Sequence, residues 1–546
     1  MEKPIWIKEK GYLHLSPSLK LGSDYSKITS LLDNEDFIAK YAFYPLIHAN
    51  IKERKFKKGN LTKHTSEERS HIHYNVTTNE PIRSAKIRPL HYATHFDSIV
   101  YNYYAYKLNK KYISKLKEIP ELNNAVTAYR KIPRIDEPSK GKSNIHFAKE
   151  CFDEVIKRAN VEKEVLVLAF DLEKFFSSLD HKYLKEKWAW LIDKTELPLD
   201  HYNVFKSCTK FNYVLLEDLK SFSKKRSYDE SKLAFIRKNK GYKSFFLDNE
   251  DFRKQIKEGN LPIYKSPFTT KLSNGKKISK GIPQGLPVSA VLANLYLFDF
   301  DLNVVNKIVH ELGGFYRRYS DDILIVTSPD KEEIIENFIK DEIQKYKITL
   351  SLDKTEKFIF KTKVYNASNQ ERLESLKIII ENNKRIYKHK PLVYLGFEFR
   401  GYNVCIKSTN LSKYYRKTIS IIKSRSNRVH KLTQADPNTK SAIYINQLKK
   451  IYELPPKKKP YSGKEQEGTK RRRYRLKKHI NGYFFIEHMD SSKNLTKKEA
   501  TYYSYVKKCS EVFETNSFEK QIRKRKHIVF SAITKHFNQS KKNRKT

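Results

Sequence analysis

The sequence predicts a mixed α+β fold in which a small antiparallel sheet is combined with many helices. One apolar run, Val165 to Phe170, has the length of a buried strand and ends at Asp171. Two β-prone runs flank Ser320–Asp322, which predicts a hairpin whose turn exposes two adjacent carboxylates. Residues 147–159 place apolar side chains at helical spacing, so helices are expected to pack around the sheet.

Composition predicts a folded protein whose partner is a polyanion. The 546 residues carry a formal net charge of +47, with 39% hydrophobic and 13% aromatic residues, too many for a disordered polycation. Nucleic acid is the first candidate partner and an anionic membrane surface the second. No uncharged apolar run approaches the roughly 20 residues of a spanning helix, and the N-terminus does not resemble a signal peptide. We therefore expect no membrane association.

Cysteine usage indicates a reducing, cytoplasmic location. The four cysteines lie far apart and form no CxxC pair. Neither a disulfide framework nor a zinc finger is expected from this spacing.

Local patterns predict the remaining elements. From the N-terminus we expect a terminal extension with helical pieces over residues 1–80, a helix beginning at or shortly after Pro89, a loop over 133–142 and a helix capped near Asp180. Further along we expect a helical insertion over 182–280, a Pro/Gly turn leading into an apolar helix over 281–301, and a helical, basic chain past residue 410 that includes an amphipathic helix over 411–424.

The adjacent aspartates, Asp321 and Asp322, are the first candidates for catalytic residues. Like charges this close raise each other's pKa and cost stability, so a neutralising group is expected. Mg²⁺ accepts carboxylate oxygens and keeps other positions for water and substrate phosphates. With Asp171 as a third ligand, two ions could lie about 3.5–4 Å apart and support phosphoryl transfer. Two aspartates in a turn are also common without any function.

Five motifs in a fixed order sharpen this interpretation: LAFDLEKFF, PQGLPVSAVLANLYL, YSDDILIV, LDKTEKF and YLGFEF. Together they resemble the palm of reverse transcriptases. The resemblance implies a right-hand polymerase with fingers, a palm with an antiparallel sheet, a helical thumb, and N-terminal and C-terminal helical basic extensions. The implied domains are an extension at 1–80, fingers at 81–164, palm at 165–181 and 281–404 with the primer grip, an insertion at 182–280, and a basic helical thumb and RNA-binding region at 405–546.

The resemblance also implies roles for single residues. Asp171, Asp321 and Asp322 would be catalytic ligands of two Mg²⁺ ions, with Mn²⁺ as an alternative, and Lys354 would protonate pyrophosphate. Phe176 would be the steric gate against a ribose 2′-hydroxyl; an ordinary core phenylalanine is the alternative. The other implied dNTP contacts are Lys86, Arg88, Arg130, Gln284 and Gly285. The implied primer and template contacts are Tyr319, Tyr394, Gly396 and Lys142.

A basic cluster lies outside the five motifs. Residues 457–478 carry a local charge excess of about +9, and their tyrosines could stack on unpaired bases. The candidate RNA-binding residues are Lys457, Lys458, Arg471, Arg472 and Arg473. A solvated loop in a lysine-rich protein is the alternative interpretation.

The expected function is RNA-directed DNA synthesis from dNTPs on an RNA template. The combination of KIRPLHYATH, AYRKIP, GKSNIHFAKE and FDLEKFFSSLDH resembles the bacterial "unknown group" reverse transcriptases, relatives of the group II intron and retron enzymes, several of which act in anti-phage defence. That resemblance implies a non-coding RNA encoded beside the gene as template, with priming by RNA, DNA or a protein tyrosine left open, as is an oligomer or a second protein partner. Two alternatives stand: a template-independent nucleotidyltransferase, and a non-catalytic RNA-binding scaffold of the maturase type.

Overall fold

The computed structural model divides the chain into two compact units. Unit 1 comprises Met1–Ile132 and Leu166–Lys357, and unit 2 comprises Pro133–Val165 and Phe358–Thr546. The described residues are 3–8, 10–17, 25–54, 57–58, 69–70, 72–74, 81–83, 85–225, 227–240, 244–271, 275, 277–351, 354–365, 370–382, 384–435, 473–478, 484–489 and 501–542. In the strands between 53 and 86 and between 473 and 489, only the backbone is described. The domain scheme expected from the sequence stays a prediction.

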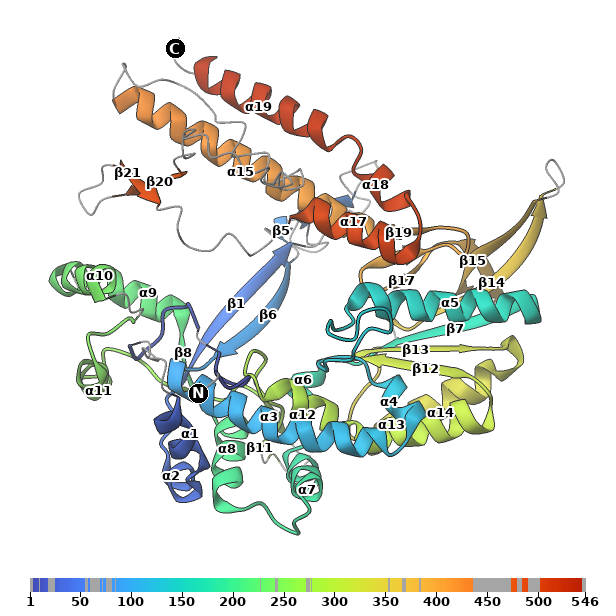
Figure 1. The fold of residues 1–546 in the computed structure, drawn as a ribbon, viewed down its shortest axis with the longest axis horizontal. Helices are drawn as coiled ribbons and strands as arrows, with labels where there is room; N and C mark the ends of the chain where they lie inside the picture. The colour runs from blue at the N-terminus through green and yellow to red at the C-terminus, as the bar shows by residue number, and fades with distance from the viewer. Residues whose placement is uncertain are drawn as a thin grey trace, which may run out of the picture. The chain divides into compact units, whose positions relative to one another are not determined.

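Unit 1 carries three neighbouring antiparallel strands, called the central sheet below. They are β7 (Glu164–Asp171), β12 (Phe315–Tyr319) and β13 (Asp322–Thr327), in the order β12–β13–β7 (Figure 1). The middle of β13 is fully buried, as is most of β7, which explains their apolar runs. The predicted strand and hairpin are confirmed, and the hairpin turn consists of only Ser320 and Asp321.

Helices precede and follow these strands along the chain of unit 1. They are α3 (His95–Lys117), α4 (Pro120–Ala125), α6 (Phe175–Ser178), α7 (His181–Leu191), α12 (Ser289–Tyr296), α13 (Phe298–Val304), a π-helical segment (Val305–Glu311), a 3₁₀ turn (Pro329–Lys331) and α14 (Glu332–Lys345). The helix predicted to be capped near Asp180 is confirmed, because the Asp180 side chain accepts a hydrogen bond from the Tyr183 amide at 2.9 Å. The apolar helix predicted over residues 281–301 is confirmed as α12 and α13.

The N-terminal extension and the insertion fold together. Their elements are α1 (Ser26–Asp33), α2 (Glu35–Lys40), β1 (Leu46–Arg54), β2 (Lys57–Lys58), β3 (Arg69–Ser70), β4 (Ile72–Tyr74), β5 (Pro81–Arg83), β6 (Ala85–Tyr92), α8 (Leu199–Thr209), β8 (Asn212–Leu215), α9 (Leu216–Lys225), α10 (Ser227–Lys240), α11 (Asn249–Lys257), β9 (Tyr264–Lys265), β10 (Thr269–Lys271) and β11 (Lys277–Ser279). A sheet in the order β6–β1–β8–β9 joins the two segments.

A shared core explains why both segments contain strands where helices alone were expected. Leu15 and Ile47 from the extension pack with Val214, Leu219 and other buried residues of the insertion. Each segment alone has too few apolar residues to show this burial, because their partners lie about 170 residues apart in the sequence. The non-local pairing of β1 with β8 therefore could not be predicted from local patterns.

The helix expected near Pro89 begins later. Pro89 lies in β6, opposite Asn50 of β1, and α3 begins at His95 with Thr94 as its N-cap. The strand tolerates a proline because β6 is at the edge of its sheet, where a missing amide donor costs least.

A buried histidine predicts acid sensitivity of unit 1. The His14 imidazole bonds the Tyr92 carbonyl through Nε2 at 2.9 Å, and its Nδ1 accepts from the Leu15 amide at 2.7 Å, which requires the neutral ring. Burial lowers the pKa of His14 from its ordinary value of 6.5 to about 3. The unfolded chain binds the proton more readily, so this contribution to stability is complete above pH 6.5 and is lost as the pH falls towards 3.

We expect the thermal midpoint of the full chain to fall between pH 7.5 and pH 4.5. In a His14→Phe variant the midpoint should be lower throughout but should depend less steeply on pH. Equal slopes in both proteins would assign the acid sensitivity to other groups.

Unit 2 combines one long helix pair with strands of three to twelve residues. Its elements are α5 (Asn144–Glu162), β14 (Glu356–Tyr365), β15 (Gln370–Glu381), β16 (Lys384–His389), β17 (Leu392–Tyr394), β18 (Phe397–Phe399), β19 (Val404–Ile406), α15 (Ser408–Ala435), β20 (Arg473–Lys478), β21 (Phe484–Met489), α17 (Tyr502–Phe513), α18 (Ser517–Gln521) and α19 (Arg525–Lys542). The β14–β15–β16 and β17–β18–β19 groups are each hydrogen-bonded in that order.

Aromatic and aliphatic contacts hold unit 2 together. The Phe399 ring stacks on Phe152 and Phe360, with ring centroids 4.5 and 5.1 Å apart. Ile422 of α15 packs against Val529 of α19. The helices predicted over 147–159 and 411–424 are confirmed as parts of α5 and α15. Past residue 410 the chain is not helical throughout, because β20 and β21 form a hairpin.

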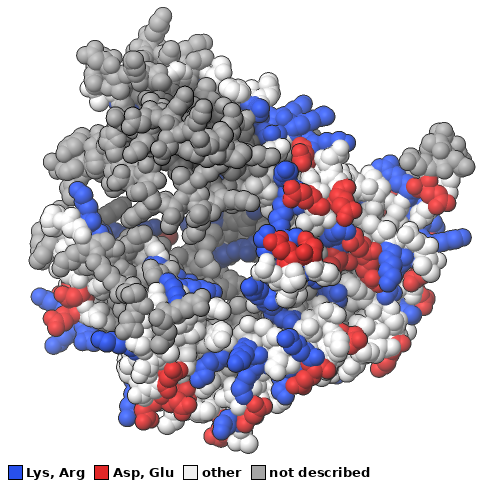
Figure 2. All heavy atoms as spheres, viewed as in Figure 1, with Lys and Arg blue, Asp and Glu red and all other residues white. Residues whose placement is uncertain are grey.

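On the face seen in Figure 2, the charged side chains at the bottom of the picture are mixed in sign. In the lower part of Figure 2, Lys and Arg side chains alternate with Asp and Glu. Among the described helices, none is long and apolar enough to cross a membrane.

Candidate active site

The carboxylates singled out by the sequence meet at one end of the central sheet. In the antiparallel register, Asp322 of β13 lies directly opposite Asp171 of β7. Cross-strand partners have Cβ atoms about 5 Å apart and project from the same face. Asp321 adjoins them in the turn, and its carbonyl accepts the Leu172 amide at 3.2 Å. Two strands distant in the sequence thus bring three aspartates together.

The donor set fits a hard divalent cation. All three aspartates are partly exposed, so their oxygens can reach a ligand, and two like charges directly opposite in a sheet are destabilising without a counter-ion. Here the Lys354 ammonium supplies a positive charge by an ion pair with Asp171. Within the described part of the chain, no three His, Cys, Asp or Glu side chains already converge as a metal site. The ion pair engages Asp171 through Oδ2.

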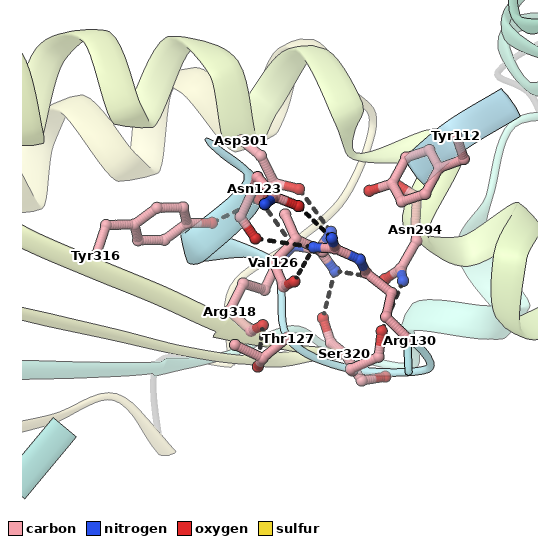
Figure 3. Close-up of polar contacts among 11 residues, drawn as sticks. Tyr112, Asn123, Val126, Thr127, Arg130, Asn294, Asp301, Tyr316, Arg318 and Ser320 are labelled. Carbon is pink, nitrogen blue, oxygen red and sulfur yellow. Dashed lines mark hydrogen bonds and ion pairs between the residues drawn. The ribbon is translucent and has the colours of Figure 1, made fainter. Parts of the chain in front are cut away.

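The turn that carries Asp321 rests on a buried ion pair (Figure 3). Arg318 of β12 and Asp301 of α13 are both fully buried and form a fork, with Nε–Oδ1 and Nη2–Oδ2 distances of 2.7 and 2.5 Å. The Tyr316 hydroxyl donates to the same carboxylate at 2.6 Å. Burial alone would lower the pKa of Arg318, but Asp301 holds it above its ordinary value. Arg318 therefore stays charged inside unit 1.

An aromatic pair lies beside the turn. Tyr129 is 47% exposed, and its hydroxyl is 2.9 Å from Ser320 Oγ. Its ring meets Phe176 edge-on, with the centroids 6.5 Å apart. Phe176 is only partly buried, whereas its neighbour Phe175 lies in the core. Phe176, the candidate steric gate, therefore lies next to Tyr129.

The Gln284–Gly285 turn is fixed by backbone contacts. The His91 amide donates to the Gln284 carbonyl at 2.8 Å, which attaches the turn to β6. The Ile282 amide donates to the Phe176 carbonyl at 2.7 Å, which attaches it to α6. Gly285 has a φ of +113°, and a Cβ there would lie 2.4 Å from the His91 carbonyl oxygen. Only glycine fits this approach.

Replacing Gly285 with alanine should therefore displace the turn. We expect a loss of about 2 kcal/mol in stability and an increase in the KM for dNTP, measured by thermal unfolding and steady-state synthesis. Gly313→Ala is the matched control, because Gly313 also has a positive φ but a Cβ there meets nothing within 4 Å. Equal effects of both variants would refute the steric argument.

The basic residues expected to bind the triphosphate lie in different surroundings. Arg130 donates from Nη1 to the Asn123 and Val126 carbonyls at 2.9 and 2.6 Å, so it caps the end of α4. It would have to leave these partners to reach a nucleotide. Arg88 is exposed on β6. Lys86 lies in the same strand, but its side chain is outside the described part.

The predicted primer and template residues divide between the units. Tyr319 is in unit 1, directly opposite Asp322. Lys142, Tyr394 and Gly396 are in unit 2. Lys142 is ion-paired with Glu150 at 2.5 Å. Lys457, Lys458, Arg471 and Arg472 lie outside the described residues, and only the backbone of Arg473 is described, in β20.

Comparison with known families now decides the class of protein. The family model described as "Reverse transcriptase (RNA-dependent DNA polymerase)" matches residues 99–399, more than half of the chain. The chain belongs to the reverse transcriptase family. The match contains Asp171, Asp321, Asp322 and the Gln284–Gly285 turn, so the site lies within the reverse transcriptase domain. This domain is an RNA-directed DNA polymerase domain of the nucleotidyltransferase class, and its mixed helix and sheet fold is confirmed.

Similar solved structures include telomerases from Candida. The apo telomerase of Candida tropicalis truncated from its C-terminal domain is 11% identical, with a TM-score of 0.31, over 69% of this chain and 60% of that one. The telomerase of Candida albicans in complex with a TWJ fragment of telomeric RNA is 10% identical, with a TM-score of 0.30, over 75% and 53%. The reverse transcriptase therefore spans between half and two thirds of these chains. No curated protein sequence matches it.

Sequence reasoning missed the residues that support the reverse transcriptase site. Arg318, Asp301 and Tyr129 were not singled out, although one signal was available. In the strand FYRRY, residues alternate between faces, so Arg318 must lie on the same buried face as Tyr316. An arginine at an inward position requires a buried partner, and that requirement could have directed attention to the neighbouring helices.

Proposed function

We propose that this reverse transcriptase synthesises DNA from dNTPs on an RNA template, with Asp171, Asp321 and Asp322 holding two Mg²⁺ ions. The observation that carries the proposal is the register that sets Asp322 opposite Asp171 and places Asp321 in the adjoining turn. A buried ion pair beneath the turn supports it, since a rigid carboxylate site suits metal-dependent phosphoryl transfer.

In the proposed mechanism, each part of the site has a separate role. When bound, the two ions would neutralise the triphosphate and favour attack by the primer 3′-hydroxyl. Asp171, Asp321 and Asp322 would hold them, and Lys354, released from Asp171, would supply a proton to the departing pyrophosphate. The Gln284–Gly285 turn, fixed between β6 and α6, would line the nucleotide pocket. Tyr319, Tyr394, Gly396 and Lys142 would contact primer or template.

A test should separate the proposed activity from the two alternatives. The full chain would be incubated with labelled dNTPs, Mg²⁺ and an RNA template carrying a DNA primer, with parallel samples lacking template or pretreated with ribonuclease. We expect synthesis only with intact RNA. Synthesis after ribonuclease treatment would favour a template-independent nucleotidyltransferase, and no synthesis under any condition would favour an RNA-binding scaffold.

Phe176 is proposed to select deoxynucleotides by blocking a 2′-hydroxyl. Phe176→Ala should raise ribonucleotide incorporation relative to deoxynucleotide incorporation, because removing the ring leaves room for the 2′-hydroxyl. We expect a factor of at least about tenfold, the discrimination that a pocket achieves against one small group. The measurement is the ratio of kcat/KM for paired rNTP and dNTP substrates. Phe235→Ala is the control, since Phe235 is an exposed phenylalanine in α10, outside the site. An unchanged ratio would return Phe176 to a structural role.

We also propose a role in bacterial anti-phage defence. The four segments from KIRPLHYATH to FDLEKFFSSLDH, which resemble the defence-associated "unknown group" enzymes, support this proposal. A cytoplasmic location and a non-coding RNA partner would follow from it. Expression in a phage-sensitive bacterium should reduce plaque formation, and an Asp321→Asn variant should not.

A further inference from the structure

Ser320 has an unfavourable backbone conformation at the centre of the site. Its φ is +61°, in the left-handed region that non-glycine residues seldom adopt. It precedes Asp321 in a turn of only two residues between β12 and β13, so the conformation of Ser320 directs the aspartates that follow. A residue in this region costs of order 1–3 kcal/mol and persists only when its surroundings hold it.

Two side chains hold Ser320, one at its backbone carbonyl and the other at its side-chain hydroxyl. Arg318 Nη1 donates to the Ser320 carbonyl at 3.0 Å, and the Tyr129 hydroxyl meets Ser320 Oγ at 2.9 Å (Figure 3 shows the arginine contact). Arg318 has little freedom, because Asp301 grips its guanidinium and Asn294 Oδ1 accepts from Nη1 at 3.2 Å. Arg318 is therefore the fixed support of the turn.

Tyr129 is the second support, and the two residues before it are held by hydrogen bonds to β12 and α12. Both the amide and the hydroxyl of Thr127 donate to the Arg318 carbonyl at 3.0 Å. Asn294 Nδ2 donates to the Ala128 carbonyl at 2.9 Å. Tyr129 follows with a φ of +62°, so a second left-handed residue faces the first. These anchors keep the Tyr129 hydroxyl within reach of Ser320.

We propose that Tyr129 is a positioning residue that holds Ser320 and thereby sets the metal affinity of Asp321 and Asp322. The hydroxyl does not touch the reacting atoms and acts only through Ser320. It also joins the segment after α4 directly to Ser320, in the turn that carries Asp321. The inference depends on the proposed metal site, and its test must distinguish the two.

The test measures Mn²⁺ binding to the full chain without nucleotide, by the loss of the free Mn²⁺ signal in electron paramagnetic resonance. Tyr129→Phe deletes one hydroxyl, Ser320→Ala deletes its partner, and a double variant deletes both. Tyr106→Phe is the matched control, because Tyr106 is an exposed tyrosine of α3 away from the site. Asp321→Asn serves as the reference for loss of the metal site. Thermal unfolding is recorded for every variant.

We expect Tyr129→Phe and Ser320→Ala each to weaken Mn²⁺ binding by about three- to tenfold, the range that one hydrogen bond accounts for. The double variant should bind like the single ones, since all three lack the same contact. The Mg²⁺ concentration for half-maximal synthesis should rise by the same factor, with little change in thermal midpoint.

The inference would be overturned if Tyr129→Phe bound Mn²⁺ with native affinity while Asp321→Asn lost binding. Losses that add up in the double variant would also overturn it, because the hydroxyls would then act separately. Native Mn²⁺ affinity in Asp321→Asn would instead contradict the proposed metal site itself.

Discussion

Replacing Asp321 with asparagine is expected to reduce DNA synthesis by at least about a thousandfold, because the turn loses a charge that the two ions require. The backbone should be unaffected, since asparagine has the same shape and the Asp321 carbonyl keeps its bond to the Leu172 amide. Initial rates of labelled dNTP incorporation on a primed RNA would measure the effect.

The control for this prediction is Asp341→Asn. Asp341 is an exposed carboxylate of α14, outside the catalytic turn, so its replacement should leave synthesis within about twofold of native. Comparable activity of Asp321→Asn and Asp341→Asn would contradict the assignment of the turn as the catalytic centre.

The second large effect is expected from the buried pair beneath the turn. Arg318→Met should destabilise the protein by about 3–5 kcal/mol, because it leaves the Asp301 charge uncompensated in the core. The Ser320 carbonyl and Asn294 would also lose a donor. The shift in denaturant midpoint would report the change, together with a loss of synthesis.

Two further variants test the cause. Arg317→Met removes the adjacent arginine, which lies on the other face of β12 and is not paired with Asp301, so it should cost less than about 1 kcal/mol. Combining Arg318→Met with Asp301→Leu removes both charges and should recover part of the stability. If the double variant were less stable than Arg318→Met, an uncompensated charge could not be the explanation.

The central sheet could be predicted from the sequence because its signals are local. The apolar run ending at Asp171 and the paired runs around Asp321 have strand length and strand composition, and the structure confirms both. The family membership followed from ordered motifs, and the family match confirms it at the level of reverse transcriptases.

The surroundings of the site depend on contacts between distant segments, which local patterns do not record. The pairing of β1 with β8 joins residues 167 positions apart, so part of the extension that was expected to be helical lies in a sheet. The partners of Arg318 come from α12 and α13, which the sequence of β12 alone does not indicate. Arg130 looked like a free cation in the sequence, but its local capping role depends on where α4 ends.

The most direct test of the central claim is to read the product. The full chain would copy a primed RNA of arbitrary defined sequence in the presence of all four dNTPs and Mg²⁺, and the newly made DNA would be sequenced. A reverse transcriptase with this site should yield DNA complementary to the RNA, and Asp321→Asn should yield none. DNA unrelated to the RNA, or equal product from Asp321→Asn, would contradict the account.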